Sequence, residues 1–139
     1  KNIDMSLYDS PNNFDLRKID VRWTNLCNFS CVYCGPEFSS KWAAELKIQT
    51  PYPSEKQLEQ FKDYIFKHVD QLRHVYLAGG EPLINEKVYK LLDTIGQKDI
   101  QPEVVINSNI ASIKPKFYNV FKKIKKLWQQ LLMEEDALE

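Results

Sequence analysis

The sequence predicts an α/β fold, a partial (β/α) barrel of about three strand–helix units with parallel strands. Three observations lead to this prediction. Short apolar segments of strand character alternate with longer segments of helical periodicity. The cysteine-containing and glycine-containing motifs follow strands, which is where parallel α/β folds collect their chemistry. The 139 residues suffice for one hydrophobic core, whereas an eight-unit barrel takes roughly 250 residues.

The first predicted unit pairs a short strand with a long helix. Three apolar residues alternate with polar ones, which is the period of a strand: Ile19, Val21 and Trp23. A loop and a short helix over 38–46 follow, and nearby prolines end that helix. Ser54 begins the long helix, because Ser54 and Gln57 form a capping-box pattern. The expected apolar stripe of this helix is Leu58, Phe61, Ile65, Val69 and Leu72.

The second and third units repeat the same order. A strand is predicted over 74–78, and a helix capped by Asn85 ends at Gly96. A third strand over 104–106 is almost wholly apolar, as expected for a covered parallel strand. Pro115 suits the first turn of a third helix. The apolar stripes of the two helices are Val88, Leu91, Leu92 and Ile95, then Phe117, Phe121, Ile124, Trp128 and Leu131.

We place the domain boundaries where the apolar periodicity begins and ends. Residues 1–14 form a polar lead-in segment, residues 15–133 the core domain, and residues 134–139 an acidic tail. On this plan the third strand lies at an open edge of the sheet, which proteins normally cover or pair.

Charge and hydropathy exclude several classes of partner. Nineteen basic and nineteen acidic residues cancel, so net charge does not attract nucleic acid or a membrane surface. No apolar run approaches the length of a membrane-spanning helix, and no signal-peptide pattern opens the chain. We therefore expect a soluble cytoplasmic protein.

The cysteines indicate a metal site. Cys27, Cys31 and Cys34 are the only three in the chain and lie within eight residues, which is a poor framework for disulfides. Three thiolates at this spacing can hold a [4Fe–4S] cluster and leave one iron open to another ligand. The alternatives are a zinc site completed by His68 or His74, and three buried structural cysteines.

Two motifs together resemble those of radical S-adenosylmethionine (SAM) enzymes. Residues 27–34, CNFSCVYC, are similar to the family's CxxxCxΦC motif, with an aromatic residue before the last cysteine. Residues 79–82, GGEP, resemble its GGEP motif and follow the second predicted strand. The sequences of residues 23–27, WTNLC, and 39–42, SSKW, are similar to those of the twitch-type branch of the family. The resemblance spans roughly residues 19–126, the first half of a typical family core.

The resemblance implies a role for each motif residue. The cluster ligands would be Cys27, Cys31 and Cys34, and the SAM-binding residues would be Tyr33 against the adenine, Gly79, Gly80 and Glu81 at the methionine ammonium, Pro82 as a stiffener, and Asn107 and Asn109 beside the nucleoside. For the two asparagines, capping of a turn is an equally good interpretation. Gly80→Val is then expected to weaken SAM binding and leave the cluster intact. Arg22 and Asn25, beside the cysteines, are expected to be structural.

The implied reaction is reductive cleavage of SAM to methionine and a 5′-deoxyadenosyl radical, which abstracts a hydrogen atom from an unidentified substrate. Such an oxidoreductase-type enzyme needs a low-potential electron donor of the flavodoxin or ferredoxin type. Because three units make only part of a barrel, the isolated chain is expected to be incomplete without further residues or a partner chain. A truncated, non-catalytic module that binds cluster and SAM is the alternative, together with the zinc-binding α/β domain.

Overall fold

The structure is a computed structural model that describes residues 16–131, with the backbone alone described for 128–131. The predicted lead-in (1–14) and acidic tail (134–139) lie outside the described residues. Strands and helices alternate along the described chain, which confirms the predicted α/β class. Within the described residues, no helix combines the length and the apolar character needed to cross a membrane.

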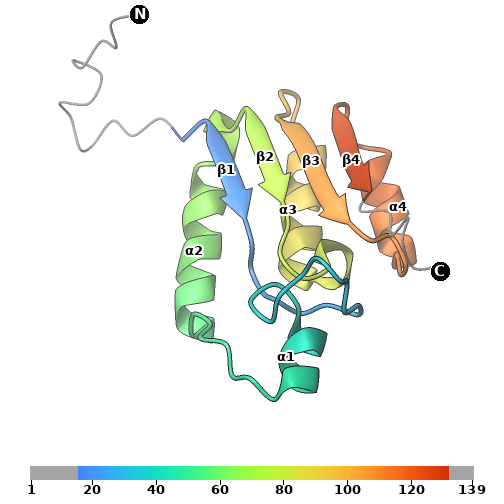
Figure 1. Cartoon of the computed structure of the whole chain (residues 1–139). Helices are drawn as coiled ribbons and strands as arrows, with labels where there is room; N and C mark the ends of the chain where they lie inside the picture. Colours follow the sequence, from blue (N-terminus) through green and yellow to red (C-terminus); the bar gives the residue numbers. More distant parts are fainter. Residues whose placement is uncertain (1–15, 132–139) are drawn as a thin grey trace, which may run out of the picture.

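A parallel sheet with the strand order β1-β2-β3-β4 forms the centre of the fold. Its strands are β1 (Lys18–Val21), β2 (His74–Leu77), β3 (Glu103–Ser108) and β4 (Leu127–Leu131). Three helices cover one face of the sheet (Figure 1): α2 (Glu55–Lys67), α3 (Glu86–Gly96) and α4 (Pro115–Phe121). The short helix α1 (Ser40–Leu46) lies near the ends toward which the strand arrows point. The 3-10 turns are η2 (Val69–Gln71) and η3 (Pro82–Ile84).

The fourth strand corrects the predicted third helix. The apolar residues from 117 to 131 have helical spacing, but α4 ends at Phe121 and β4 pairs with β3 in parallel. The side chain of Gln101 accepts from the Lys125 amide and donates to the Lys123 carbonyl, so the turn after α4 is held by a residue before β3. Pairing with β4 satisfies the backbone N–H and C=O groups at the edge of β3. The predicted open edge at the third strand is therefore wrong.

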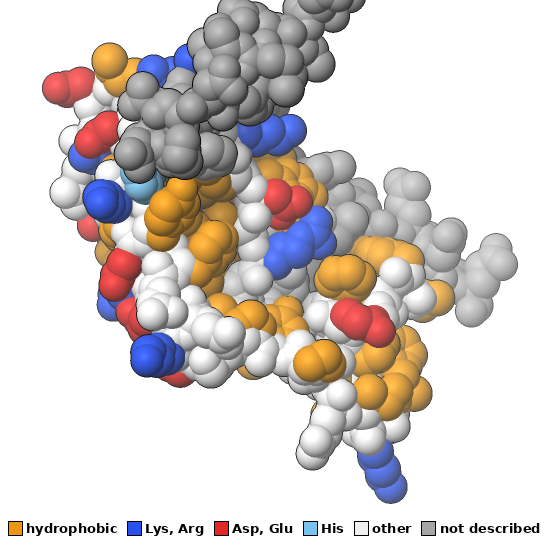
Figure 2. Space-filling model, turned by 90° about the vertical axis from the view of Figure 1, so that its left-hand side faces the viewer, with side chains coloured by type: hydrophobic (Ala, Val, Ile, Leu, Met, Phe, Trp, Pro, Cys, Tyr) orange, Lys and Arg blue, Asp and Glu red, His pale blue; other side chains and the backbone are white. Residues whose placement is uncertain are grey.

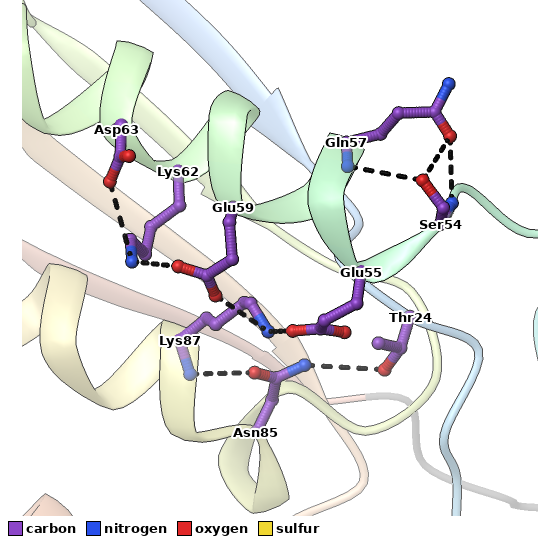
Figure 3. Close-up of polar contacts among 9 residues, drawn as sticks. All are labelled: Thr24, Ser54, Glu55, Gln57, Glu59, Lys62, Asp63, Asn85 and Lys87. Atoms are coloured by element: carbon purple, nitrogen blue, oxygen red, sulfur yellow. Dashed lines mark hydrogen bonds and ion pairs between the residues drawn. The ribbon is translucent and has the colours of Figure 1, made fainter.

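The first long helix begins as predicted and ends earlier. The Ser54 hydroxyl accepts from the Gln57 amide, and the Gln57 side chain accepts from the Ser54 amide at 2.8 Å (Figure 3). The helix stops at Lys67, and Val69 lies in η2, where it is still buried. Phe61, predicted on the buried stripe, is 42% exposed.

The two faces of the sheet differ in composition. The helix-covered face is apolar and fully buried, with Val21, Leu77 and Ile106 at its centre. Alternate residues on the opposite face are polar or partly exposed, as with Asp20 and Asn107. On the side formed by α2 and β1, acidic and basic side chains are interspersed with hydrophobic ones (Figure 2). The same alternation continues past β1, where Arg22 is exposed on the polar face and Trp23 is buried on the other.

Ion pairs connect α2 and α3, two of the helices that cover the sheet. Lys87 of α3 lies 2.7 Å from Glu55 and 3.4 Å from Glu59 of α2 (Figure 3). The Asn85 side chain caps α3 by accepting from the Lys87 amide and donates to the Thr24 hydroxyl at 3.3 Å. Thr24 follows β1, so the start of α3 is tied to the segment that leads into the cysteines.

Candidate functional site

A cavity of about 220 Å³ lies where the first three strands end. Three stretches of chain line it: the segment after β1, the segment after β2 and the end of β3. The lining residues are Arg22, Cys27, Cys31, Tyr33, Cys34, Phe38, Ala78, Gly79, Gly80, Glu81, Asn107 and Asn109. The fold thus gathers every predicted site residue except Pro82, which is buried at the start of η3. The cavity is also lined by Arg22, Phe38 and Ala78, which belong to neither sequence motif.

Residues 24–39, here called the cysteine loop, contain no helix or strand, and the start of α1 holds their shape. The Ser39 hydroxyl caps α1 and donates to the Phe29 carbonyl at 2.6 Å. The Trp42 indole donates to the Cys31 carbonyl at 2.8 Å, and the Ser40 hydroxyl accepts from the Cys27 amide at 3.1 Å. These bonds give the serines and tryptophan after the cysteines a local structural function.

The three thiols face the same cavity. Cys31 is buried, and Cys27 and Cys34 are half-buried. None of the three forms a disulfide. Burial raises the pKa of the Cys34 thiol, and the neighbouring Cys27 raises that pKa further, while a hydrogen bond with Cys31 partly offsets both. The three thiols are thus grouped on one wall of the cavity.

The donor set consists of three thiols that line one cavity. A [4Fe–4S] cluster binds each thiolate at a different iron, so three thiols leave one iron without a protein ligand. A structural zinc ion takes four ligands, so it would need a fourth donor besides these cysteines.

Neither histidine lies near the cysteines. His68 ends α2 and packs against the Tyr64 ring. His74 begins β2 and faces Glu103 at 3.5 Å, at the end of the sheet opposite to the cavity. A four-residue strand spans roughly 13 Å. The fold therefore offers no histidine to complete a zinc site with these three cysteines.

Residues 79–82, here called the GGEP loop, pack against the backbone of the cysteine loop. The Glu81 amide donates to the Leu26 carbonyl at 2.8 Å, and the Gly80 amide donates to the Phe38 carbonyl at 3.0 Å. Gly80 has a φ of +51°, and a β-carbon there would lie 2.2 Å from the Leu26 oxygen. The side chain added in Gly80→Val would displace the cysteine loop, so we expect this substitution to affect the cluster as well as SAM binding.

Glu81 is a buried carboxylate with three hydrogen bonds. It is 2% exposed, and one oxygen accepts from the Leu83 amide at 2.9 Å and from the Ser108 hydroxyl at 2.6 Å. The other oxygen accepts from the Asn109 amide at 2.8 Å. No described basic side chain forms an ion pair with it. A carboxylate has about four acceptor positions, so the negative charge beside the cavity retains capacity for a cation.

The two asparagines at the end of β3 differ in their contacts. Asn109 donates to the Asn28 side chain at 3.0 Å and accepts from the Ala111 amide, so it both bridges to the cysteine loop and caps a turn. The Oδ1 atom of Asn107 is buried without a hydrogen-bond partner among the described residues. Buried acceptors are normally satisfied, so this atom indicates a donor that would be supplied by a bound group.

The expectation that Arg22 and Asn25 are structural holds for one of them. The Asn25 amide donates to the Pro36 carbonyl and to the Thr50 hydroxyl, both at 3.2 Å, and so fixes the cysteine loop internally. Arg22 lines the cavity instead. The signal that could have found it is the strand period, because residue 22 is two positions beyond Asp20 on the polar face.

Comparison with known proteins agrees with these motifs. A sequence model of the Radical SAM superfamily matches residues 21–130. The chain is 25% identical over 101 residues to a GTP 3′,8-cyclase of Campylobacter lari, an alignment that covers 72% of this chain and 29% of that protein. A GTP 3′,8-cyclase of Desulforamulus reducens is 26% identical over 98 residues, with 70% and 28% covered. The chain spans less than a third of the length of these relatives.

Proposed function

The chain belongs to the radical SAM superfamily, and on that premise we propose that it forms the part of a radical SAM enzyme that holds a [4Fe–4S] cluster and SAM. The observation that carries the proposal is the single cavity in which three cysteines, the GGEP loop and the end of β3 meet. When bound, the two cofactors supply reductive cleavage of SAM and hydrogen-atom abstraction from a substrate.

Cys27, Cys31 and Cys34 would hold the cluster. Three cysteine ligands leave one iron of a four-iron cluster without a protein thiolate, which suits a site that also binds a second cofactor. The amide of Phe29 lies 3.5 Å from the Cys27 sulfur and can donate to it. Such a hydrogen bond stabilises a thiolate and influences the potential of a cluster bound there.

The GGEP loop and the end of β3 would bind SAM. Gly79 and Gly80 line the cavity, and their backbone carbonyl oxygens would be acceptors for the methionine ammonium. The buried Glu81 carboxylate adds a negative charge, and Pro82 restricts the turn. The partnerless Asn107 oxygen is a suitable acceptor for a SAM donor group, and Asn109 lies beside it. Tyr33, 56% exposed at the cavity wall, is available to cover the adenine.

The proposal extends to the class of reaction and names no individual substrate. The relatives are GTP 3′,8-cyclases, but the chain covers too little of them to carry their substrate over. An oxidoreductase-type reaction on an unidentified substrate, a flavodoxin-type or ferredoxin-type electron donor and a cytoplasmic location stay predictions. The alternative function is a module that binds cluster and SAM without turnover.

Iron and sulfide analysis after anaerobic reconstitution tests the cluster. We expect about four irons and four sulfides per chain. Cys31→Ala should abolish iron binding, because it removes the buried thiol of the set. One equivalent of zinc with no iron uptake would contradict the proposal and favour the zinc-binding domain.

Formation of 5′-deoxyadenosine distinguishes the enzyme from the binding module. The reconstituted protein is incubated with SAM and dithionite, and the nucleoside is quantified. Product that depends on Cys31 supports the enzyme. Tight SAM binding without product supports the binding module.

A further inference from the structure

Arg22 is the one positively charged side chain among the described residues that line the cavity. Every other polar group on the wall is neutral, a thiol or a carboxylate. A cation in such a place either pairs with groups of the protein or serves a ligand, and the contacts of Arg22 distinguish the two.

Because Gly79 has no side chain, the backbone and β-carbon of Arg22 can pack directly against it. A β-carbon on Gly79 would lie 2.8 Å from the Arg22 β-carbon and 3.2 Å from its α-carbon, and Gly79 has a φ of +80°. The first glycine of the GGEP loop thus packs against the arginine. The position of the guanidinium is therefore coupled to the loop proposed to bind SAM.

Two groups orient the guanidinium without burying it. Its Nε and Nη2 atoms both lie 3.3 Å from Asp20 oxygens, and its carbon lies 5.7 Å from the centre of the Phe38 ring. The Arg22 and Asp20 side chains are 45% and 50% exposed, so their pairing contributes little to stability. A guanidinium has five N–H donors, which is more than the Asp20 contacts require.

The cavity lining thus holds one cation and one carboxylate next to the same glycine pair. The Glu81 carboxylate follows Gly80 in the chain, and Arg22 packs on Gly79. An α-amino acid carries an ammonium and a carboxylate on one carbon, and its two charges match this arrangement.

We propose that Arg22 binds an anionic oxygen group, a carboxylate or a phosphate, of a ligand in the cavity. The source that the charge arrangement favours is the carboxylate of SAM, and in that form the inference rests on the proposed function. A phosphate of the substrate has the same chemistry and is the other source.

Binding measurements on the reconstituted protein test this inference. SAM affinity is measured for the wild type, Arg22→Gln and Arg22→Lys, together with the affinity for 5′-methylthioadenosine, which lacks the amino-acid portion. Lys18→Gln is the matched control, because it removes one positive charge from the other end of β1, far from the cavity lining.

We expect Arg22→Gln to weaken SAM binding at least about tenfold, because a charge-assisted hydrogen bond is lost. Arg22→Lys should restore part of the affinity, since it keeps the charge but not the planar fork. Affinity for 5′-methylthioadenosine and iron content should not change, and Lys18→Gln should behave as the wild type.

Pyrophosphate, titrated into the same proteins, distinguishes the two sources. Normal SAM affinity with loss of pyrophosphate binding in Arg22→Gln would assign Arg22 to a substrate phosphate. Unchanged affinity for both SAM and pyrophosphate would overturn the inference. Failure of the wild type to bind SAM would contradict the proposed function, and the pyrophosphate titration would still test Arg22.

Discussion

The cysteine loop and the GGEP loop both follow a strand and line the same cavity, yet they are built differently. The GGEP loop is short and buried, with Glu81 2% exposed and hydrogen-bonded on both oxygens. The cysteine loop is long and open, with Val32 92% and Tyr33 56% exposed. Hydrogen bonds within the cysteine loop are mostly short-range turns, such as Cys34–Cys31 and Phe38–Gly35, and the Asn25–Pro36 and Ser39–Phe29 bonds connect its more distant parts.

The difference indicates that the conformation of the cysteine loop depends on the segments that pack against it. Helix α1 holds the cysteine loop on one side through Ser40 and Trp42, and the GGEP loop supports it on the other through the Leu26 carbonyl. A buried, hydrogen-bonded segment is stable without a ligand, whereas an open loop gains stability from what it binds. Substitutions in the GGEP loop should therefore damage the cluster site more than substitutions of cysteine-loop residues other than the three cysteines.

The largest effect is expected for Gly80→Val. The new side chain requires a β-carbon 2.2 Å from the Leu26 oxygen and a positive φ, at a combined cost of about 3 kcal/mol or more. We expect a lower urea midpoint for the apoprotein and loss of most bound iron. Gly35→Ala is the control in the cysteine loop, since its β-carbon would meet only the movable end of Glu37. Full iron content in Gly80→Val would break the comparison.

Glu81→Gln should have the second largest effect. The amide group of glutamine would place a donor opposite the amide or hydroxyl donors that the carboxylate now accepts from. We expect the apoprotein to lose about 2 kcal/mol of unfolding free energy, measured by urea denaturation. The exposed Glu37→Gln is the matched control and should leave stability unchanged. Equal stability of the two variants would show that the buried network is not what supports the cavity.

Ser39→Ala should affect the cluster more than the fold. The hydroxyl caps α1 and bonds the Phe29 carbonyl, and loss of a cap costs about 1 kcal/mol. We expect a small decrease in apoprotein stability but a clear increase in the rate at which a chelator removes iron. A normal rate of iron loss would mean that α1 does not hold the cysteine loop.

Val32→Ser should have the smallest effect. The side chain lies between two cysteines in sequence but is 92% exposed. Exposed substitutions usually change stability by less than about 0.5 kcal/mol. We expect unchanged unfolding and unchanged iron content. A large loss of iron would show that the cysteine loop holds its own shape through side chains that the comparison treats as unimportant.

Much of the fold and of the site follows from local sequence signals. The capping box at Ser54, the cap at Asn85 and the strand at 104–106 are set by neighbouring residues and are found in the structure. Because parallel strands end at the same edge, two motifs that follow adjacent strands must meet. That rule correctly brought the cysteines and the GGEP loop to one cavity.

The remainder depends on pairing that is not encoded locally. Residues 117–131 have helical spacing, and only the free edge of β3 selects a strand for their second half. Two of the three partners of Glu81, Ser108 and Asn109, lie at the end of β3, more than twenty residues away, so sequence alone could not show that its carboxylate is internally bonded. The sequence predicts a structural role for Arg22, because local signals do not show that Arg22 packs against Gly79 and lines the cavity.

The central claim is that the two loops form one site, and an EPR spectrum tests it most directly. The reconstituted, reduced protein is measured before and after addition of SAM. A cluster on the cysteine loop gives the signal, while the GGEP loop supplies the proposed contacts to SAM. We predict a four-iron signal that changes when SAM is added. A four-iron signal that stays the same with SAM in excess would contradict the account, because the cluster and the GGEP loop would then not share a ligand.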